Sequence, residues 1–444
     1  MALTAMDIYK SLPRTNCKEC GFPTCMMFAM QVAAKQKAIT DCPHISDDAK
    51  SDLSEASTPP IKLVKIGSEV NQVEIGQETV MFRHEEKFHH PAGLAVRIPA
   101  SLSDSDALDM AEKINSSKFE RVGEELKVAF CAVEIEGCNE PALRVKSLSD
   151  KIDVPIILIG KDVNIMKSCV EAIKSERPLI YKADRNNIDG FIEIALSSKC
   201  PLSIEADTLE EAADLTKKAK DKGLQNIILS FNGKEVRDTL ELLTKVRRAA
   251  LKKNFRPLGY PTMVEVDSDT PEEETVTASI YAAKYASIII INGIEAWQIL
   301  PIVTTVQNIY TDPQVPNTVE AKLYEIGSPD ESSPVMFTTN FALTYFSVAG
   351  EVERSKIASY ISVVDTEGLG VLNAYAGDKI SVEKVVKTMN EQNITNKVKH
   401  RKLIIPGLLP IYRAEIEDTS DWEEVIIGTE SAREIPAFLN KIWK

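Results

Sequence analysis

Residues 201–231, PLSIEADTLEEAADLTKKAKDKGLQNIILSF, decide the fold of most of this chain. The stretch begins and ends with the apolar runs PLSIEA (201–206) and NIILSF (226–231), which are typical of strands buried on both faces. Residues 207–223 between them have a helical pattern that ends at Gly223, a common helix stop. The stretch therefore predicts two parallel strands joined by a helix.

The same alternation continues on both sides of this unit. Eight strand-plus-helix units in roughly 220 residues match the count and size of a TIM barrel, which we expect over residues 93–312. The other six strand-like runs cover residues 94–99, 128–135, 154–160, 178–183, 262–267 and 287–293.

A second alternation follows a polar, proline-containing segment, residues 313–334, which is typical of a linker. Four strands in roughly 110 residues predict a small doubly wound α/β domain over residues 335–444. Ligands of such sheets lie beyond the carboxyl ends of the strands. We expect the strands at residues 334–340, 360–365, 402–407 and 423–428.

The chain ahead of the barrel divides into two parts. Residues 1–58 contain a cysteine-rich segment and most of a polar linker. The linker, residues 46–60, ends in two prolines. Residues 59–92 contain three β-like runs, which predict a short β meander leading into the barrel. These runs cover residues 61–67, 71–76 and 78–85.

The composition limits the possible partners. A formal net charge of −14 argues against nucleic acid and anionic membranes, because both require a basic surface. No apolar run approaches the roughly 18 residues of a spanning helix, and the N-terminus lacks the pattern of a secretory signal. We therefore expect a cytoplasmic protein.

Residues 16–43, NCKECGFPTCMMFAMQVAAKQKAITDCP, hold Cys17, Cys20, Cys25 and Cys42, half of the eight cysteines. Four thiols this close together predict a metal site. Zinc sites usually pair two short CxxC hooks, whereas this segment has one hook and two widely spaced cysteines. The spacing favours a [4Fe–4S] cluster, with structural zinc as the alternative.

A helix is expected to begin at Cys25, where its N-terminal dipole would favour an anionic cluster. His44 is expected to be a surface residue, and the other cysteines, which lack ligand spacing, to be packing residues. Polar residues at the ends of the barrel strands are expected to form a solvated rim or docking surface. The packing cysteines are Cys131, Cys138, Cys169 and Cys200.

The cysteine motif, the eight-unit barrel, PVMFTTNFALTYFSVAGEVE (334–353) and VVDTEGLGVLNAYAGDKI (363–380) occur together in this order. The combination resembles the large subunit of the corrinoid iron–sulfur protein, the gamma-subunit family of the acetyl-CoA decarbonylase/synthase complex. The resemblance spans the whole chain. It implies a [4Fe–4S] cluster on Cys17, Cys20, Cys25 and Cys42 and a cobamide on the C-terminal domain.

The resemblance also implies a methyltransferase-type carrier, a component of a methyl-transfer system in the reductive acetyl-CoA pathway of anaerobes. Its cobamide, as Co(I), would accept a methyl group from methyltetrahydrofolate through a methyltransferase and pass it to acetyl-CoA synthase. The cluster would mediate reductive reactivation of Co(II). The implied partners are a small subunit in a heterodimer, the methyltransferase, acetyl-CoA synthase/CO dehydrogenase and a low-potential electron donor or reductive activator.

Loops after the C-terminal strands offer small residues and side-chain hydrogen bonds to such a ligand. The turn DTEGLG (365–370) lacks histidine, and His400 precedes its strand, at the opposite end of the sheet. We therefore expect a base-off cobamide without a protein ligand. The expected contacts are Thr339, Asn340, Thr344, Phe346, Gly368, Leu369, Gly370, Val371, Leu372, Asn373, Ala376, Gly377, Pro406, Gly407, Leu408, Gly428, Ser431, Ala432, Arg433 and Glu434.

Two other functions remain open at this point. One is an iron–sulfur electron-transfer protein with a flavin or nicotinamide domain at its C-terminus, although GLGVLNAYAG lacks the full dinucleotide glycine pattern. The other is a barrel methyltransferase that acts on a pterin.

Overall fold

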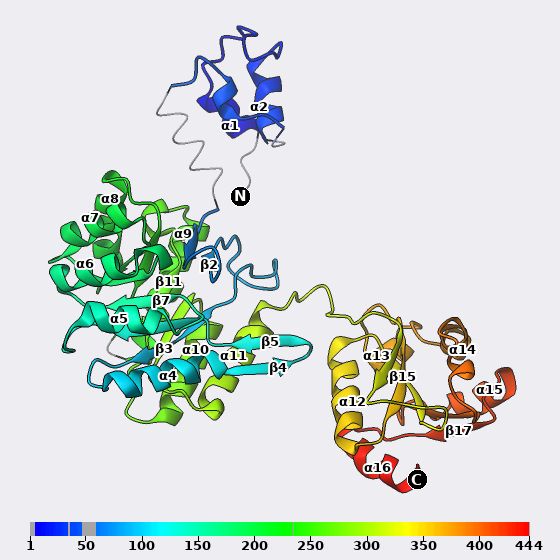
Figure 1. Cartoon of the computed structure of the whole chain (residues 1–444). Helices are drawn as coiled ribbons and strands as arrows, with labels where there is room; N and C mark the ends of the chain where they lie inside the picture. The colour runs from blue at the N-terminus through cyan, green and yellow to red at the C-terminus, as the bar shows by residue number, and fades with distance from the viewer. Residues whose placement is uncertain (1–4, 34–35, 47–58, 234, 444) are drawn as a thin grey trace. The chain divides into compact units, whose positions relative to one another are not determined.

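The structure is a computed structural model and describes residues 5–33, 36–46, 59–233 and 235–443. It divides into two compact units, which are considered separately. Unit 1 comprises residues 1–119 and 126–310, and unit 2 comprises residues 120–125 and 311–444 (Figure 1). The expected linker at 46–60 lies almost entirely outside the described residues. No helix in the described part of the chain is long and apolar enough to cross a membrane.

The cysteine-rich segment has a small apolar core of its own, which includes Ile8, Phe28 and Ile45. A helix begins at Cys25 as expected, because the hydroxyl of Thr24 accepts a hydrogen bond from the backbone N–H of Met27. The elements are α1 (Ala5–Ser11), α2 (Cys25–Ala33) and the 3₁₀ helix η1 (Ile39–Asp41).

The TIM barrel is confirmed. Its eight parallel strands close in the order β10-β11-β12-β3-β6-β7-β8-β9, and each lies within one of the expected runs or overlaps it. The strands are β3 (Gly93–Ile98), β6 (Phe130–Glu134), β7 (Ile156–Ile159), β8 (Leu179–Ala183), β9 (Leu202–Glu205), β10 (Ile227–Ser230), β11 (Thr262–Glu265) and β12 (Ile288–Ile291).

A helix follows each strand, and the helix in the opening stretch is fixed by its caps. The hydroxyl of Thr208 accepts from the N–H of Glu211, whose carboxylate accepts from the N–H of Asp207, and Gly223 has a positive φ after the helix. The barrel helices are α4 (Asp104–Ser116), α5 (Pro141–Ser149), α6 (Val163–Ala172), α7 (Ile188–Ser198), α8 (Leu209–Asp221), α9 (Val236–Lys252), α10 (Pro271–Ala283) and α11 (Ala296–Tyr310), with 3₁₀ turns η2 (Lys174–Glu176) and η3 (Arg256–Leu258).

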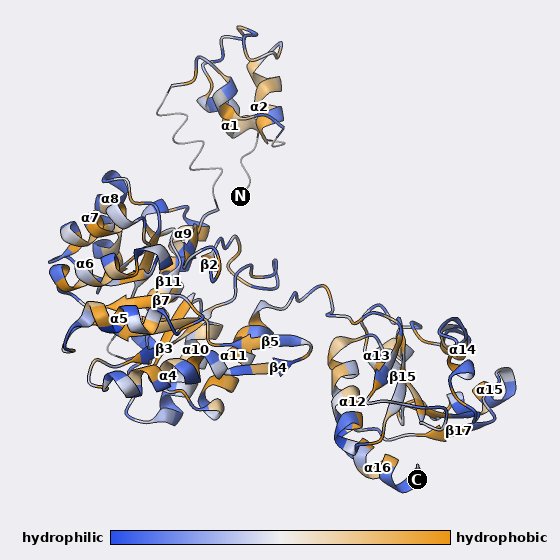
Figure 2. Cartoon of the chain, in the orientation of Figure 1, coloured by the Kyte–Doolittle hydropathy of each residue, from blue (hydrophilic) through white to orange (hydrophobic). Residues whose placement is uncertain are grey.

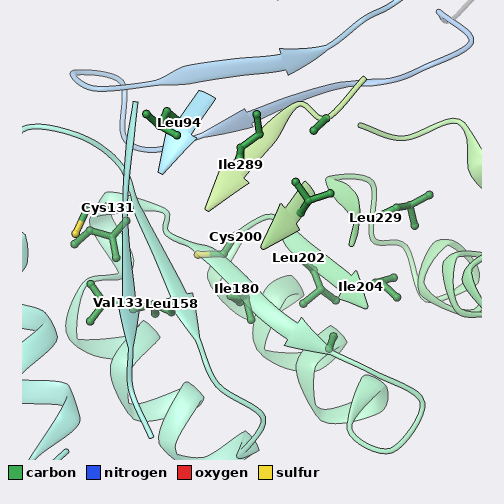
Figure 3. Packing of buried hydrophobic residues seen from close by; sticks show 14 of the residues in the cluster. Leu94, Cys131, Val133, Leu158, Ile180, Cys200, Leu202, Ile204, Leu229 and Ile289 are labelled. Carbon is green, nitrogen blue, oxygen red and sulfur yellow. The ribbon is translucent and has the colours of Figure 1, made fainter. Parts of the chain in front are cut away.

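Two apolar layers line the two faces of the barrel strands. Outward-facing residues such as Leu94, Cys131 and Ile289 pack against the helices (Figure 3). Inward-facing residues such as Phe130 and Ile290 share a second core with β1 (Leu63–Ile66) and β2 (Val73–Gly76). The hairpin β1–β2 bonds to loops that precede barrel strands, so it closes the amino-terminal end of the barrel.

The expected third strand of the meander, residues 78–85, was wrong, because this run forms no strand. Its polar residues bind α9 instead. Arg247 donates to Glu78 at 3.1 Å and to the carbonyl of Val80 at 2.6 Å, and it lies over the rings of Phe88 and Tyr285 at 4.6 Å. The segment is thus held on the barrel by a buried ion pair.

A hairpin between α4 and β6 was not predicted. It consists of β4 (Lys118–Arg121) and β5 (Glu124–Lys127), joined at Val122 and Gly123, which both have positive φ. Two such residues make the tight turn that antiparallel strands favour. The sequence KFERVGEELK did not indicate these strands, because it is charged and little of it is buried, so it lacks a continuous apolar run.

Unit 2 contains a five-stranded sheet in the order β13-β15-β14-β16-β17, with helices on both faces. The four expected strands are confirmed. An additional antiparallel edge strand, β13 (Leu323–Ile326), lies in the segment expected to be a linker. The other elements are β14 (Val335–Thr339), α12 (Ala342–Ser355), β15 (Ser359–Val364), α13 (Val371–Ala376), α14 (Val382–Glu391), η4 (Ile394–Asn396), β16 (Lys402–Ile405), α15 (Tyr412–Thr419), β17 (Glu424–Ile427), η5 (Ala432–Glu434) and α16 (Ile435–Ile442).

The buried ion pair predicts a large cost for losing one partner. Arg247→Met should lower the free energy of unfolding by about 3–5 kcal/mol, because Glu78 would remain buried without its cation. Urea unfolding followed by circular dichroism measures the change. Lys146→Ala, which removes an exposed pair with Asp150, is the control and should change little. A loss below about 1 kcal/mol in Arg247→Met would contradict the role assigned to this pair.

Candidate functional site

The sheet of unit 2 parts at its topological switch point. Strand β14 pairs with β15 along its whole length but with β16 only through Met336 and Ile404. The two strands therefore separate toward their carboxyl ends, where ligands of doubly wound sheets bind.

A cavity of about 300 Å³ lies at this separation, between the sheet and helices α12 and α16. Its lining is mainly apolar, and Thr338, which is 2% exposed, adds a hydroxyl. A few polar groups in an apolar pocket are typical of small-molecule sites. The lining residues are Met336, Phe337, Thr338, Leu343, Thr344, Ser347, Val348, Val371, Ile404, Ile405, Pro406, Leu408, Gly428, Thr429, Glu430, Ala432, Ile435, Phe438 and Leu439.

Six of the expected contact residues line this cavity: Thr344, Val371, Pro406, Leu408, Gly428 and Ala432. The expected set missed the wall supplied by α16 and, apart from Thr344, the wall supplied by α12. These walls have a signal in the sequence, because Leu343, Ser347 and Val348 lie on one helical face of FALTYFSVAGE.

Asn340 organises the loop after β15. Its side-chain oxygen accepts hydrogen bonds from the N–H of Thr366 at 2.9 Å, the hydroxyl of Thr366 at 3.0 Å and the N–H of Gly368 at 3.0 Å. Its amide nitrogen donates to Asp365 at 2.9 Å. These four hydrogen bonds fix the backbone of residues 365–368, which lead to Val371 in the cavity lining.

The two glycines of this loop serve different purposes. Gly368 has a φ of +76°, and a Cβ there would lie 2.7 Å from Pro316 and 2.8 Å from Thr318. Gly370 instead caps α13 and faces Thr344, whose hydroxyl would lie 3.5 Å from an added Cβ. Only Gly370 therefore faces the residues that line the cavity.

The loops after β16 and β17 touch each other closely. A Cβ on Gly407 would lie 2.6 Å from the carbonyl oxygen of Gly428, and one on Gly428 would lie 2.7 Å from the carbonyl oxygen of Ile405. Both glycines are required by this backbone contact, which forms one side of the cavity.

The remaining expected contacts fall outside the cavity lining. Thr339 is fully buried with a hydroxyl that has no partner among the described residues, and Phe346 packs against Tyr345 with ring centroids 5.1 Å apart. Leu369 is half-buried against the core on the other face of the sheet. The other expected contacts are exposed on or just after α13 or near η5: Leu372, Asn373, Ala376, Gly377, Ser431, Arg433 and Glu434.

His400 lies at the amino-terminal end of the sheet, as expected. One ring nitrogen is 2.9 Å from the carbonyl oxygen of Ser333, and the other accepts from the N–H of Lys402 at 3.1 Å. The ring also packs edge-on against Trp443. Both nitrogens are therefore engaged at the end of the sheet opposite the cavity.

The four clustered cysteines lie in the described part of the N-terminal segment. Cys25 and Cys42 are buried in its small core, Cys20 is half-buried and Cys17 is exposed. The N–H of Cys25, at the start of α2, is bonded to the side chain of Asn16 at 2.8 Å. Among described residues, no three of these sulfurs lie within 4.8 Å of one another, whereas ligands of a single zinc ion lie about 3.8 Å apart.

His44 is exposed, as expected, and its ring nitrogen is 2.9 Å from the carboxylate of Glu19. These two groups lie within 4.8 Å of the sulfur of Cys17. Two histidines in the segment that precedes the barrel have contacts of their own, since His84 stacks on Phe82 and His90 bonds to Gln77.

Comparisons with known proteins address the whole chain. The family model described as CO dehydrogenase/acetyl-CoA synthase delta subunit matches residues 63–439, and one described as an Fe-S cluster matches residues 12–44. The corrinoid/iron-sulfur protein large subunit of Moorella thermoacetica is 38% identical over 99% of this chain and 98% of its own. The chain belongs to this family.

Archaeal members are similarly close. The acetyl-CoA decarbonylase/synthase complex subunit gamma of Methanopyrus kandleri is 35% identical over 99% of this chain and 98% of its own, and that of Methanothermobacter thermautotrophicus is 33% identical over 100% and 99%. Among solved structures, the 7,8-dihydropteroate synthase from Vibrio fischeri ES114 has a TM-score of 0.40 at 14% identity. The match covers 55% of this chain and 97% of the synthase chain, and this likeness is too weak to carry an argument.

The carboxyl-end mouth of the barrel in this corrinoid/iron–sulfur family member is filled by its own ion pairs. Glu265 binds Arg97 at 2.5 Å and Lys182 at 2.6 Å, while Lys161 lies 3.2 Å from Asp184 and from Glu205. The sequence analysis expected polar residues at this rim. It did not predict that Glu265 and the cations Arg97, Lys161 and Lys182 would pair there, because these pairs join different strands of the barrel.

Tyr181 lies beneath these pairs. Its hydroxyl accepts from Ser230 at 3.0 Å and from Asn232 at 3.1 Å, and it lies 3.4 Å from the carboxylate of Glu205. Burial raises the pKa of Tyr181, so the phenol stays protonated at neutral pH. The hydroxyl of Tyr181 is thus bonded within the protein, whereas the buried Nε of Arg97 has no hydrogen-bond partner among the described residues.

The other cysteines of the chain are packing residues, as expected. Cys131, Cys169 and Cys200 are buried among the barrel helices and strands, and Cys138 is half-buried. Burial raises the pKa of Cys131 to about 12 and that of Cys169 to about 11. These thiols therefore remain protonated and poorly reactive at neutral pH.

The contacts of Asn340 predict a local effect when they are lost. In Asn340→Ala, the amide hydrogens of Thr366 and Gly368 should exchange with solvent at least about 5-fold faster, because each loses an acceptor worth about 1–3 kcal/mol. Hydrogen-exchange mass spectrometry of peptides covering 363–370 measures this rate. Asn373→Ala, an exposed amide on α13, is the control and should leave the rate unchanged.

Equal protection of this loop in wild type and Asn340→Ala would contradict the role of Asn340 as its organiser.

Proposed function

We propose that this chain is a methyl carrier that holds a corrinoid at the carboxyl end of the unit 2 sheet and an iron–sulfur cluster on its N-terminal cysteines. The observation that carries the proposal is the apolar cavity where β14 and β16 separate. A relative named as a corrinoid/iron-sulfur protein large subunit matches 99% of this chain, which supports the same function here.

The residues present fit one apolar part of a corrinoid, because a cavity of about 300 Å³ is much smaller than the whole ligand. The cavity accepts an apolar group, the hydroxyl of Thr338 offers a hydrogen bond, and the exposed side chains of Leu343, Leu372 and Ile411 surround the carboxyl ends of the strands. A corrinoid, when bound, supplies a cobalt centre that as Co(I) accepts a methyl group from methyltetrahydrofolate through a methyltransferase and gives it up to acetyl-CoA synthase.

We propose that the corrinoid is base-off and has no ligand from this chain. His400 is the histidine of unit 2, and both of its ring nitrogens are engaged at the opposite end of the sheet. The loops after β14, β15, β16 and β17 contain no other imidazole. Weak axial ligation would favour the reduced, nucleophilic state of the metal.

We propose that Cys17, Cys20, Cys25 and Cys42 hold a [4Fe–4S] cluster. The segment has one short hook followed by two widely spaced cysteines, whereas zinc sites usually pair two short hooks, and this spacing favours a cluster whose metal atoms occupy separate corners. Such a cluster passes single electrons at low potential. Its proposed role is occasional reductive reactivation, with electrons from a low-potential donor or activator, since methyl transfer itself is a two-electron step.

The proposed partners are a smaller subunit in a heterodimer, a methyltetrahydrofolate methyltransferase and acetyl-CoA synthase/CO dehydrogenase. The exposed apolar residues around the cavity would leave one side of a corrin ring uncovered by this chain. Leu372 is 55% exposed and Ile411 61% exposed, so a second subunit covering them would bury apolar surface.

The cluster assignment predicts the metal content. Protein purified without oxygen should contain about four iron atoms per chain, and Cys20→Ala should hold far less iron because one thiolate ligand is lost. Iron and zinc analysis with Mössbauer spectroscopy measures both. Cys138→Ala, which changes a half-buried cysteine outside the cluster motif, is the control and should keep the iron.

One zinc ion and no iron in the wild-type protein would refute the cluster and favour the zinc alternative.

The cavity assignment predicts the effect of filling it. Ser347→Trp places an indole in the lining contributed by α12, so binding of added cobamide should weaken at least about 10-fold. Arg354→Trp, at an exposed position on the same helix, is the control and should bind normally. Visible absorption after reconstitution and gel filtration measures bound corrinoid.

Normal corrinoid binding by Ser347→Trp would refute this location. A flavin spectrum in the purified wild-type protein would instead support the electron-transfer alternative.

A further inference from the structure

Helix α8 is largely hydrophilic and ends in four lysines (Figure 2). Two of them, Lys218 and Lys222, bind Asp189 of α7, each at 2.7 Å. The other two, Lys217 and Lys220, line a cavity. Cations near the end of a helix interact favourably with its dipole, which accounts for lysines at this position. The dipole does not account for the cations that other segments bring to the same cavity.

This cavity has a volume of about 280 Å³ and lies between the end of α8, the turn η3 and the residue that precedes β1. Four of its lining residues are cations and one is an acid, so the lining carries a net charge of +3 in a chain whose net charge is −14. We call this cavity the basic pocket. Its lining residues are Lys62, Thr216, Lys217, Lys220, Asp221, Arg256, Pro257 and Tyr260.

The walls of the basic pocket are joined by specific contacts between segments that are distant in the sequence. Thr216, which is 1% exposed, donates its hydroxyl to the carbonyl of Pro257 at 2.7 Å and so fixes η3 on α8. The N–H of Lys62 donates to the carbonyl of Gly259 at 3.0 Å. A Cβ on Gly259 would lie 2.3 Å from the carbonyl oxygen of Pro60, so this close approach requires glycine. The pocket is therefore a built part of the fold.

Two of the cations are positioned by contacts with neutral groups. Arg256 donates to the carbonyl of Pro59 at 3.1 Å. The ammonium of Lys62 lies 3.4 Å from the side-chain oxygen of Gln225 and 5.1 Å from the ring centroid of Tyr260. Carbonyl, amide and ring contacts of this kind orient a cation without adding a countercharge.

The chemistry of the basic pocket favours a phosphate group over a carboxylate. The planar fork of arginine matches phosphate oxygens, and lysine adds donors that rotate to meet them. A phosphate ester carries a charge of about −1.5 to −2 at neutral pH, so it offsets more of the positive lining than a carboxylate can. The volume also admits part of the molecule that carries the phosphate.

We propose that the basic pocket binds a small phosphate-bearing anion, which is either inorganic phosphate or the phosphoryl group of an organic molecule. The bound anion would join the end of α8, η3 and the chain segment that enters the β1–β2 hairpin. The inference does not depend on the proposed function, because neither the corrinoid site nor the cysteine cluster uses these residues.

Isothermal titration calorimetry of the full chain at fixed ionic strength tests the proposal, with inorganic phosphate and adenosine diphosphate as separate probes. Wild type should bind at least one probe with a dissociation constant below about 1 mM. Lys217→Glu should weaken that binding at least about 10-fold, because an exposed lysine of the lining becomes a carboxylate that repels the anion. Lys167→Glu, at an exposed position on α6, is the matched control and should bind like wild type. Thermal unfolding without either probe checks that both variants fold.

Binding of phosphate at least as tight as that of adenosine diphosphate, weakened by Lys217→Glu, would support the proposal with the free anion as ligand. Tighter binding of adenosine diphosphate, also weakened by Lys217→Glu, would support it with an organic phosphate as ligand. Failure of wild type to bind either probe, or equal affinity in wild type and Lys217→Glu, would overturn the inference and leave the proposed function intact.

Discussion

The single backbone pair between β14 and β16 is the constraint on which the proposed site depends. Met336 and Ile404 align there, and no further residues of these strands pair, whereas β14 and β15 stay bonded to their ends. A sheet that parts at its switch point must fill the gap with side chains or leave a cavity. Here Asn340 fixes one flank through the 365–368 loop, and the close contact of Gly407 with Gly428 fixes the other.

The carboxyl ends of the strands differ in polarity between the barrel and the α/β domain. At the barrel mouth, Arg97, Lys182 and Lys161 meet Glu265, Asp184 and Glu205, so charge is balanced within the fold. In unit 2 the corresponding end is apolar, hollow and surrounded by exposed aliphatic side chains. This contrast favours unit 2 as the ligand-binding part and the barrel as a scaffold for docking.

Much of the fold could be predicted because buried parallel strands are continuous apolar runs, such as IIII at 288–291, between helices with strong caps. The prediction of a strand at residues 78–85 was wrong for a physical reason. Their alternation resembles a strand, but Glu78 is drawn into an ion pair with Arg247, 169 residues away, which no local pattern reveals. The hairpin at Lys118–Lys127 was missed because its strands are charged and largely exposed.

In the candidate site, loop residues after strands were predictable from topology. The walls from α12 and α16 depend on which helix covers which face, and Asn340 proved to be the organiser of a loop only when its partners were known.

The central claim is that the corrinoid binds at the carboxyl end of the unit 2 sheet, with part of it in the cavity between β14 and β16. Hydrogen-exchange mass spectrometry of the full chain, with and without added cobamide, tests it most directly. The account predicts slower exchange in the segments that line the cavity, residues 343–348, 404–408 and 428–439, and unchanged exchange at the ends of the barrel strands. Protection at the barrel mouth, with no change in those three segments, would contradict it.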